Sequence, residues 1–271
     1  MIAADLNLDI SALAREPAKE YHAKAGEFLS SHVLAKFRLC PLLYQKDSLG
    51  LIEEPDRPAY MIGEAAHCRI LEGRDEFVRS FAVGGPVNPK TGKPFGSNTN
   101  AFSDWAAAQG RPVLTLEQAQ LIENMAVGVA MNDQAIELIL DGVAEGVVRA
   151  DYCGIPCQIR IDWLNPHLGL SDLKTCDDLT YFESDARRYG YAHQVAFYRS
   201  VLAEVIGQFV PCFFIAIEKK EPFRCGVWRI SEETLNRCAH ENSAAIERLQ
   251  DCRRLGVWPT GYEEIRVFEA I

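Results

Sequence analysis

The 271-residue sequence has no long uninterrupted apolar run. None of its apolar stretches approaches the roughly 18 uncharged residues that a membrane-spanning helix needs. Its amino-terminal residues also lack the basic region, apolar region and small-residue cleavage site of a secretory leader. We therefore expect a soluble, cytoplasmic protein that does not insert into a membrane.

Closely spaced cysteines are missing too. The nine cysteines are odd in number and scattered along the chain, unlike the framework of a disulfide-rich secreted protein. Iron–sulfur clusters use spacings of about two to four residues, and much longer gaps separate Cys40, Cys225, Cys238 and Cys252. The pattern predicts reduced thiols and argues against such a cluster.

Basic residues are in the minority. The chain has 28 Lys and Arg against 38 Asp and Glu, a formal net charge of −10. This balance argues against a protein that coats nucleic acid through its bulk charge. It leaves room for a local basic channel or for a carboxylate cluster that binds cations.

The rest of the composition is ordinary, with 48% hydrophobic, 24% charged and 10% aromatic residues. Such values are typical of soluble globular proteins and exclude collagen-like and disordered classes. No repeat or boundary divides the chain, so we predict a single domain over residues 1–271 that begins with an arm at 1–28.

A flexible loop is predicted at 84–100. This segment is rich in glycine, proline and asparagine and shows no hydrophobic period. Long loops inside compact domains are often functional, which makes Lys90 and Lys93 candidate substrate contacts. A merely solvated loop is the plainer alternative.

An apolar period of about 3.6 residues predicts helices in the first half of the chain. Ser31 is the expected cap of the first helix, which ends at Cys40 before Pro41. Thr115 and Gln118 form the pattern of a capping box. The predicted helices cover residues 31–40, 59–71, 115–131 and 133–140.

From residue 142 the apolar period changes to two, which is typical of strands. We expect strands at 142–152, 155–164, 169–175, 209–218 and 224–230, a helix at 184–206, and a final helix capped by Ser231. This order predicts an α/β fold with a mixed central β-sheet flanked by helices.

Charged residues interrupt the second of these strands. Ile159, Ile161 and Trp163 should share one face of it. Arg160 and Asp162 then share the other face. A carboxylate therefore projects from a strand that is otherwise part of the core.

The next strand carries Asp172 and Lys174 on one face, with roughly 6.6 Å of backbone between them. A short turn at 165–167 would bring Asp162 and Asp172 side by side. Two such carboxylates repel each other unless a divalent cation such as Mg²⁺ favours both ionised forms. Lys174 could then hold or deprotonate a water and stabilise charge on a phosphoryl group. A structural ion pair between Asp172 and Lys174 is the alternative.

Other candidates lie outside these two strands. Glu145 could face the same pocket from the preceding strand. Gln194 and Tyr198 are four residues apart on a helix and address one surface. His67 is either a structural histidine or, as neutral imidazole, a metal ligand.

Five short motifs follow one another along the chain: Gly63-Glu64-Ala65-Ala66-His67, Glu145, Arg160-Ile161-Asp162, Ser171-Asp172-Leu173-Lys174-Thr175 and Gln194-Val195-Ala196-Phe197-Tyr198. Their order and spacing resemble the PD-(D/E)xK nuclease superfamily, most closely the nuclease domain of the RecE (exonuclease VIII) and lambda-exonuclease-like enzymes. The resemblance covers residues 30–230 and implies a restriction-endonuclease-like core, with the catalytic core at 142–230. Ile161 replaces the proline of the superfamily name, which supplies no ligand.

The resemblance implies roles for individual residues. His67, Asp162, Asp172 and the main-chain carbonyl of Leu173 would bind the metal. Lys174 would position or activate the attacking water.

It implies further roles around that centre. Glu145 resembles the accessory acid of the family, and Gln194 with Tyr198 resembles the helix pair behind the site. The candidate substrate contacts are Lys24, Ser30, Ser31, Arg38 and Arg160, the first four of them to a terminal 5′ phosphate.

The implied activity is that of a Mg²⁺-dependent exodeoxyribonuclease with two metal ions, for which Mn²⁺ can substitute. It would degrade linear double-stranded DNA from the 5′ end and leave 3′ single-stranded tails for recombination. The implied partners are further copies in a ring-shaped trimer or tetramer and a single-strand annealing protein. Two alternatives stay open: a RecB-like single-strand nuclease or endonuclease of the same fold, and a non-catalytic DNA-binding subunit.

Overall fold

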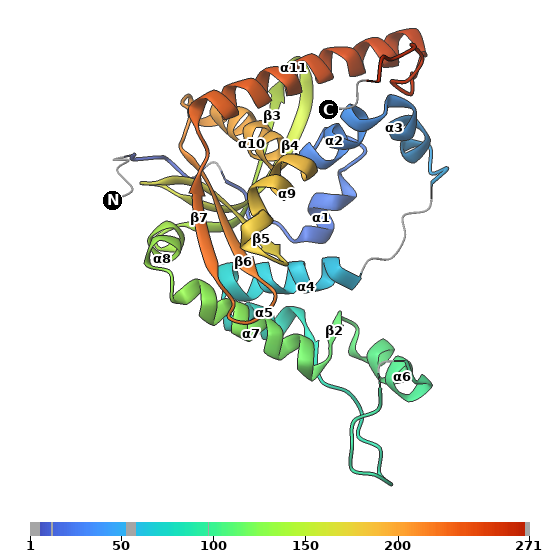
Figure 1. The fold of residues 1–271 in the computed structure, drawn as a ribbon, viewed down its shortest axis with the longest axis vertical. Helices are drawn as coiled ribbons and strands as arrows, with labels where there is room; N and C mark the ends of the chain where they lie inside the picture. Colours follow the sequence, from blue (N-terminus) through green and yellow to red (C-terminus); the bar gives the residue numbers. More distant parts are fainter. Residues whose placement is uncertain (1–5, 12, 53–57, 97, 269–271) are drawn as a thin grey trace.

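The computed structural model describes residues 6–11, 13–52, 58–96 and 98–268 (Figure 1). Its centre is a five-stranded sheet in the order β3-β4-β5-β6-β7. The strands are β3 (Val143–Tyr152), β4 (Ile155–Asn165), β5 (Gly169–Cys176), β6 (Cys212–Glu218) and β7 (Cys225–Arg229). Only β5 and β6 pair in parallel, so the sheet is mixed, as the sequence predicts.

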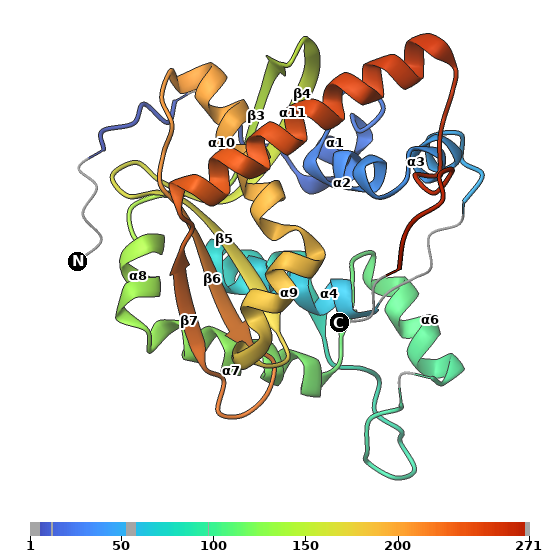
Figure 2. The same ribbon diagram turned by 45° about the horizontal axis from the view of Figure 1, so that its top comes forward.

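Helices cover both faces of this sheet (Figures 1 and 2). One core cluster joins the sheet to α2 (Ser31–Leu39), α9 (Phe182–Tyr189), α10 (Tyr191–Ile206) and α11 (Glu232–Leu255). A second joins it to α4 (Pro58–His67), α7 (Leu116–Ala130) and α8 (Asp133–Ile139). The α/β fold with a mixed central sheet flanked by helices is therefore confirmed.

Shorter elements complete the described part of the chain. They are α1 (Ala18–Ala23), α3 (Pro41–Ser48), a π-helix (Cys68–Glu72), α5 (Arg74–Ser80), α6 (Asn100–Gln109), a 3₁₀ turn (Leu179–Tyr181), and the parallel pair β1 (Ala82–Val83) and β2 (Val113–Leu114). Among the described helices, none combines the length and the apolar character that crossing a membrane requires.

The interior strand β6 is buried along its whole length. Phe213, Ile215 and Ile217 belong to the cluster beneath α7, whereas Phe214 and Ala216 belong to the cluster beneath α10. A strand with both faces covered reads as a continuous apolar run. This burial makes β6 and its parallel neighbour β5 a firm base for the charged residues of β5.

The helix caps follow the sequence closely. Thr115 and Gln118 form the predicted capping box, with each side chain accepting a hydrogen bond from the backbone N–H of the other residue. Ser231 caps α11 as predicted. The cap of α2 is Ser30, which accepts a hydrogen bond from Val33, so the prediction of Ser31 is wrong by one residue.

Two helical predictions need correction. The helix expected at 184–206 is two helices, because Gly190 adopts a left-handed conformation (φ 70°) that ends α9 and starts α10. The helix expected at 59–71 is α-helical only to His67 and then continues as a π-helix that ends at Gly73. The change in winding falls directly after the histidine that the sequence marks as a candidate ligand.

The predicted arm and loop are described in part, because residues 1–5, 12 and 97 lie outside the described residues. The backbone of the arm bonds to the turn after β4, through Leu8, and to β3, through Ala14. The segment at 84–99 has no helix or strand among its described residues beyond one bridge between Val87 and Pro94, and α6 begins at residue 100.

Asn165 closes the turn between β4 and β5. Its side-chain amide, in a residue only 3% exposed, donates to the carbonyls of Leu138 (3.2 Å) and Leu140 (2.8 Å). Its carbonyl oxygen accepts from the backbone N–H groups of His167 (2.9 Å) and Leu168 (3.1 Å). One side chain thus ties the turn to the end of α8.

Asn165→Ala should lower the free energy of unfolding by about 2–4 kcal/mol, because buried backbone groups lose partners worth about 1 kcal/mol each. Urea denaturation measures the loss. Asn236→Ala, at an exposed position of α11, is the control and should change stability by less than about 0.5 kcal/mol. Equal stability of the Asn165 variant and the wild type would contradict this account of the turn.

Candidate active site

The candidate site lies where β4 and β5 separate. These strands pair at only three positions, the last joining Trp163 to Ser171. Continuing that register would pair Asp162 with Asp172, but the ladder has already ended. The Asp162 carboxylate accepts a hydrogen bond from the backbone N–H of Leu173 instead (2.9 Å). The Asp162 side chain thus replaces a backbone hydrogen bond between the two strands, and beyond this point β4 and β5 are no longer paired.

The opposite edge of β4 is irregular at the same residue. Its pairing with β3 skips Asp162 and Glu145, and Glu145 has a left-handed backbone (φ 55°). Such a conformation is costly for a residue other than glycine, and conformations of this kind cluster at functional sites. This irregularity breaks the alternation along β4: Trp163 packs against the cluster opposite that of Ile159 and Ile161, so the prediction that the three share one face is wrong.

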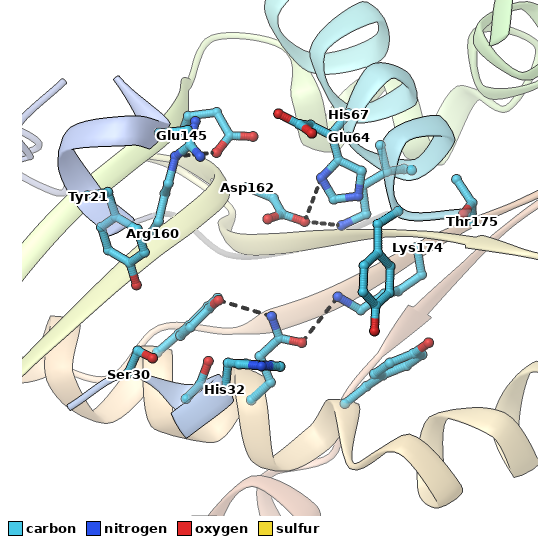
Figure 3. A pocket seen from close by; sticks show the side chains of 18 of the residues that line it. Tyr21, Ser30, His32, Glu64, His67, Glu145, Arg160, Asp162, Lys174 and Thr175 are labelled. Carbon is cyan, nitrogen blue, oxygen red and sulfur yellow. Dashed lines mark hydrogen bonds and ion pairs between the residues drawn. The ribbon is translucent and has the colours of Figure 1, made fainter. Parts of the chain in front are cut away.

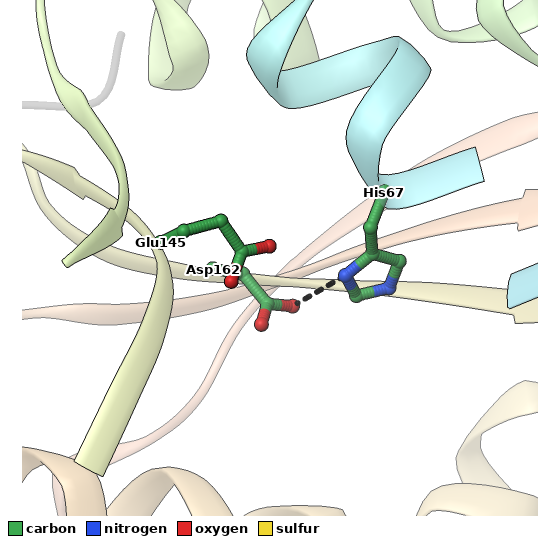
Figure 4. A group of neighbouring side chains, drawn as sticks. All are labelled: His67, Glu145 and Asp162. Atoms are coloured by element: carbon green, nitrogen blue, oxygen red, sulfur yellow. Dashed lines mark ion pairs between the residues drawn. The ribbon is translucent and has the colours of Figure 1, made fainter. Parts of the chain in front are cut away.

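Three side chains from three elements converge here (Figure 4). His67 ends α4, Glu145 lies on β3 and Asp162 on β4, and each offers a ligand atom within 4.8 Å of the others. The Nδ1 atom of His67 is 3.4 Å from a carboxylate oxygen of Asp162. Glu145 also forms an ion pair with Arg160, whose Nε lies 2.8 Å away (Figure 3).

Asp172 and Lys174 form a buried ion pair beside this group, with Nζ 2.6 Å from the carboxylate. The Asp172 side chain is fully buried, and among the described residues the Lys174 ammonium is the one partner its oxygens have. A buried carboxylate with so few partners is costly. It has the coordination capacity that a divalent cation would use.

Helix α10 holds the lysine from the other side of the site. The Lys174 ammonium donates to the amide oxygen of Gln194 (3.2 Å), and the amide nitrogen of Gln194 donates to the hydroxyl of Tyr198 (3.0 Å). The ammonium also lies over the ring of Tyr191, 4.8 Å from its centre. The structure thus brings the predicted pair Gln194 and Tyr198 to the predicted lysine.

The environment shifts the ionisation of the whole group. Burial, followed by repulsion from Asp162, raises the pKa of Glu145 to about 8. Burial raises the pKa of Asp172 to about 6 and also raises that of Asp162. Burial opposes the charge of Lys174, but the neighbouring carboxylates outweigh it and its pKa is raised. The lysine therefore remains protonated.

Burial has the opposite effect on the histidine. It lowers the pKa of His67 to about 4, with Lys174 as the next cause. The imidazole is neutral and can donate a lone pair to a cation. Carboxylate oxygens and a neutral imidazole are suitable ligands for a divalent cation of the Mg²⁺ or Mn²⁺ type. Such a cation would also favour the ionised forms of the neighbouring acids.

The site forms part of the wall of a cleft of about 2130 Å³. Pockets for small ligands are about 300–1,000 Å³, so this cleft is larger than such a pocket. Lys and Arg residues slightly outnumber Asp and Glu among the residues that line it. The cleft is thus less acidic than the chain as a whole.

The candidate substrate contacts divide into two groups. Ser30, Ser31, Arg38 and Arg160 line the cleft. Lys24 is not one of its lining residues and pairs with Glu16 (3.4 Å). The exposed loop lysines, Lys90 and Lys93, do not line the cleft either.

Other residues that line the cleft include Glu64, which is part of the first sequence motif but has no predicted role, and Arg188, Tyr189 and Tyr191, which are not among the residues singled out from the sequence. Glu64 lies one helical turn before His67, and its charge contributes to the raised pKa of Glu145. A signal for the tyrosines was present in Gly190, since a glycine after a helical run often ends a helix.

Comparison with known proteins agrees with this geometry. A solved structure from Eubacterium rectale, described as a "Putative exonuclease", covers 95% of this chain and 96% of its own, with a TM-score of 0.68 and 15% identity. At that identity the likeness concerns the fold. The structure of LHK-Exo in complex with dAMP is 14% identical, covers 59% of this chain and 88% of its own, and has a TM-score of 0.31, on which no inference rests. A search of curated proteins found no significant match.

The sequence model of one family matches residues 30–270. That family is described as a "PDDEXK-like domain of unknown function (DUF3799)". The match spans nearly the whole chain and includes every motif residue discussed above. The chain therefore belongs to this family of PDDEXK-like domains, and with it to the PD-(D/E)xK superfamily.

Proposed function

We propose that the protein is a metal-dependent nuclease that hydrolyses phosphodiester bonds of DNA. The observation that carries the proposal is the convergence of His67, Glu145, Asp162 and Lys174 on the cleft, with the fully buried Asp172 paired to that lysine. We further propose that it acts as an exonuclease on linear double-stranded DNA, with 5′ to 3′ polarity, and leaves 3′ single-stranded tails for recombination. The family membership supports the nuclease class, and the finer activity follows from the resemblance to RecE-like enzymes.

The proposed metal ligands are His67, Asp162, Asp172 and the carbonyl of Leu173, with Mg²⁺ as the ion, two ions in the full site and Mn²⁺ as a substitute. When bound, the cation supplies charge that polarises the scissile phosphate and stabilises the leaving oxygen. Glu145, which pairs with Arg160, is the proposed accessory acid.

Lys174 supports the chemistry from outside the ligand set. Its ammonium is aimed by Asp172 and Gln194, and its raised pKa favours the charged form. A fixed positive charge at this place can orient the attacking water and stabilise the charge that grows on the phosphoryl oxygens. Gln194 and Tyr198 act as positioning residues, because each holds the next member of the chain in place.

We propose substrate contacts and assembly from the same surface. Ser30, Ser31, Arg38 and Arg160 would contact the DNA strand, and Lys24 would reach it only beyond the cleft. A chain at −10 needs its basic residues concentrated where DNA passes. A ring-shaped trimer or tetramer repeats one basic surface around a channel, and a single-strand annealing protein would take the product.

Lys174→Ala should reduce hydrolysis of a 5′-phosphorylated linear duplex by at least about 100-fold, because it removes charge stabilisation without removing a ligand. Asp172→Ala should lose metal affinity as well. Lys46→Ala, at an exposed position of α3, is the matched control. A gel assay with linear, nicked and circular DNA measures the loss and also tests end dependence. Near-normal cleavage by the Lys174 variant would reject the assignment.

His67→Ala should raise the Mg²⁺ concentration needed for half-maximal activity by about tenfold or more, because a nitrogen ligand is lost. Metal titrations of the cleavage rate measure this shift, and His240→Ala on the exposed face of α11 is the control. A variant that melts early but keeps the wild-type metal response would show that His67 is structural.

The raised carboxyl pKa values predict that metal-free protein loses stability with rising pH. Between about pH 4.5 and 8 the native protein holds a proton at Glu145 that the unfolded chain releases. The free energy of unfolding therefore falls as pH rises through this range. Mg²⁺ should therefore raise the melting temperature more at pH 8.5 than at pH 6. Glu145→Gln should flatten the pH dependence of the metal-free protein. An equal Mg²⁺ effect at both pH values would contradict the prediction.

A further inference from the structure

A stack of charged and aromatic groups leads from Lys174 to the surface of the cleft. The lysine ammonium lies 4.8 Å from the centre of the Tyr191 ring. The rings of Tyr191 and Tyr189 are stacked, with their centres 5.8 Å apart and their planes at 29°. The guanidinium of Arg188 lies over the outer ring, 5.4 Å from its centre. All four residues line the cleft.

The break at Gly190 makes this stack possible. Residues two apart on a continuous helix do not face each other, so Tyr189 and Tyr191 could not stack on a helix that ran through. The left-handed glycine (φ 70°) separates α9 from α10 and brings the two rings together. Behind them, Tyr191 contacts the core rings of Phe182 and Phe214. The inner end of the stack is therefore fixed to the core.

The outer end is open. Tyr189 is 57% exposed and belongs to neither core cluster of the described residues. A long, exposed arginine is the group that covers its ring. The same wall carries Arg38, 4.0 Å from where a Cβ would stand on Gly190, and Arg187. An aromatic face surrounded by arginines suits a planar base attached to phosphates.

We propose that Tyr189 and Tyr191 form a stacking platform for an unpaired nucleobase of the DNA strand held at the site. The proposal rests on the proposed nuclease function, which places the strand at Lys174, the inner end of the stack. The base stacks on the outer ring of Tyr189, where Arg188 now lies, and Arg188 then pairs with the strand's phosphate or covers the base. Stacking of this kind tolerates any base, since every base has an aromatic face.

Tyr189→Ala should weaken binding of a fluorescein-labelled single-stranded oligonucleotide by about tenfold. Binding is measured without added metal, so that no cleavage occurs. Tyr189→Phe keeps the ring and should bind like the wild type. Tyr181→Ala removes a neighbouring tyrosine that is 64% exposed but does not line the cleft, and it should also bind normally. Circular dichroism melts of all variants confirm that each is folded.

A second probe separates stacking from a general loss of binding. A series of oligonucleotides, each with one abasic site, should contain one position where the wild type binds about tenfold more weakly. The abasic site at that position should not weaken the binding of Tyr189→Ala any further, because the base and the tyrosine ring are the two sides of the same contact. 2-Aminopurine at that position should be quenched by the wild type and by Tyr189→Phe, but not by Tyr189→Ala.

The two proposals fail in different ways. If the wild type cleaves DNA while Tyr189→Ala binds all strands as tightly as the wild type, the stacking platform is wrong and the nuclease proposal stands. Additive losses for the abasic site and for Tyr189→Ala would also reject the platform. If the wild type neither binds nor cleaves DNA with Mg²⁺ or Mn²⁺, both proposals are wrong.

Discussion

The early separation of β4 and β5 is the constraint on which the rest of the site depends. Three residue pairs join these strands, and the Asp162 carboxylate then bonds to the backbone of Leu173 in place of a further sheet hydrogen bond. Because β5 continues to pair with β6 over its whole length, Lys174 stays in the rigid sheet while β4 turns away with β3. The Asp162 carboxylate lines the cleft where the strands separate, and its charge acts on the fully buried Asp172 carboxylate of β5.

The burial of charged groups gives the site its chemistry. Asp172, Asp162 and Glu145 all have raised pKa values because the fold removes them from water, and repulsion from Asp162 adds to the effect at the other two. Lys174 compensates only one of them by direct contact, and Arg160 reaches only Glu145. A buried cluster of acids is costly to ionise without additional positive charge. A divalent cation, which carboxylate oxygens bind well, would supply that charge.

Helix α10 and the junction before it form the other side of the site, and they position the lysine. α10 aims the lysine through Gln194, and its first residue, Tyr191, supports the same ammonium with its ring. The glycine break before α10 turns two tyrosines toward each other and carries this surface outward to Tyr189. In the proposed scheme the sheet supplies the reacting groups, and the helix junction supplies the surface that holds the strand.

The sequence by itself determined the order of the main strands and helices, and it named most of the residues that converge at the candidate site. Local patterns decide these features: apolar alternation predicted the strands that carry Asp162 and Asp172, and the capping residues marked the starts of α7 and α11. The motif spacing led to the superfamily that the family match confirms. Features of this kind depend on residues within a few positions of one another, so they can be read without a structure.

Only the tertiary structure decided the features that depend on contacts between distant segments. The irregular pairing that turns Trp163 away from Ile159, and the left-handed backbone of Glu145, arise because β4 is paired on both sides but only in part. The cap at Ser30, the π-helix after His67 and the break at Gly190 were also missed or misplaced. The apolar periodicity of the sequence continues across these positions. It shows which face of an element is apolar, but it does not show where packing interrupts the backbone.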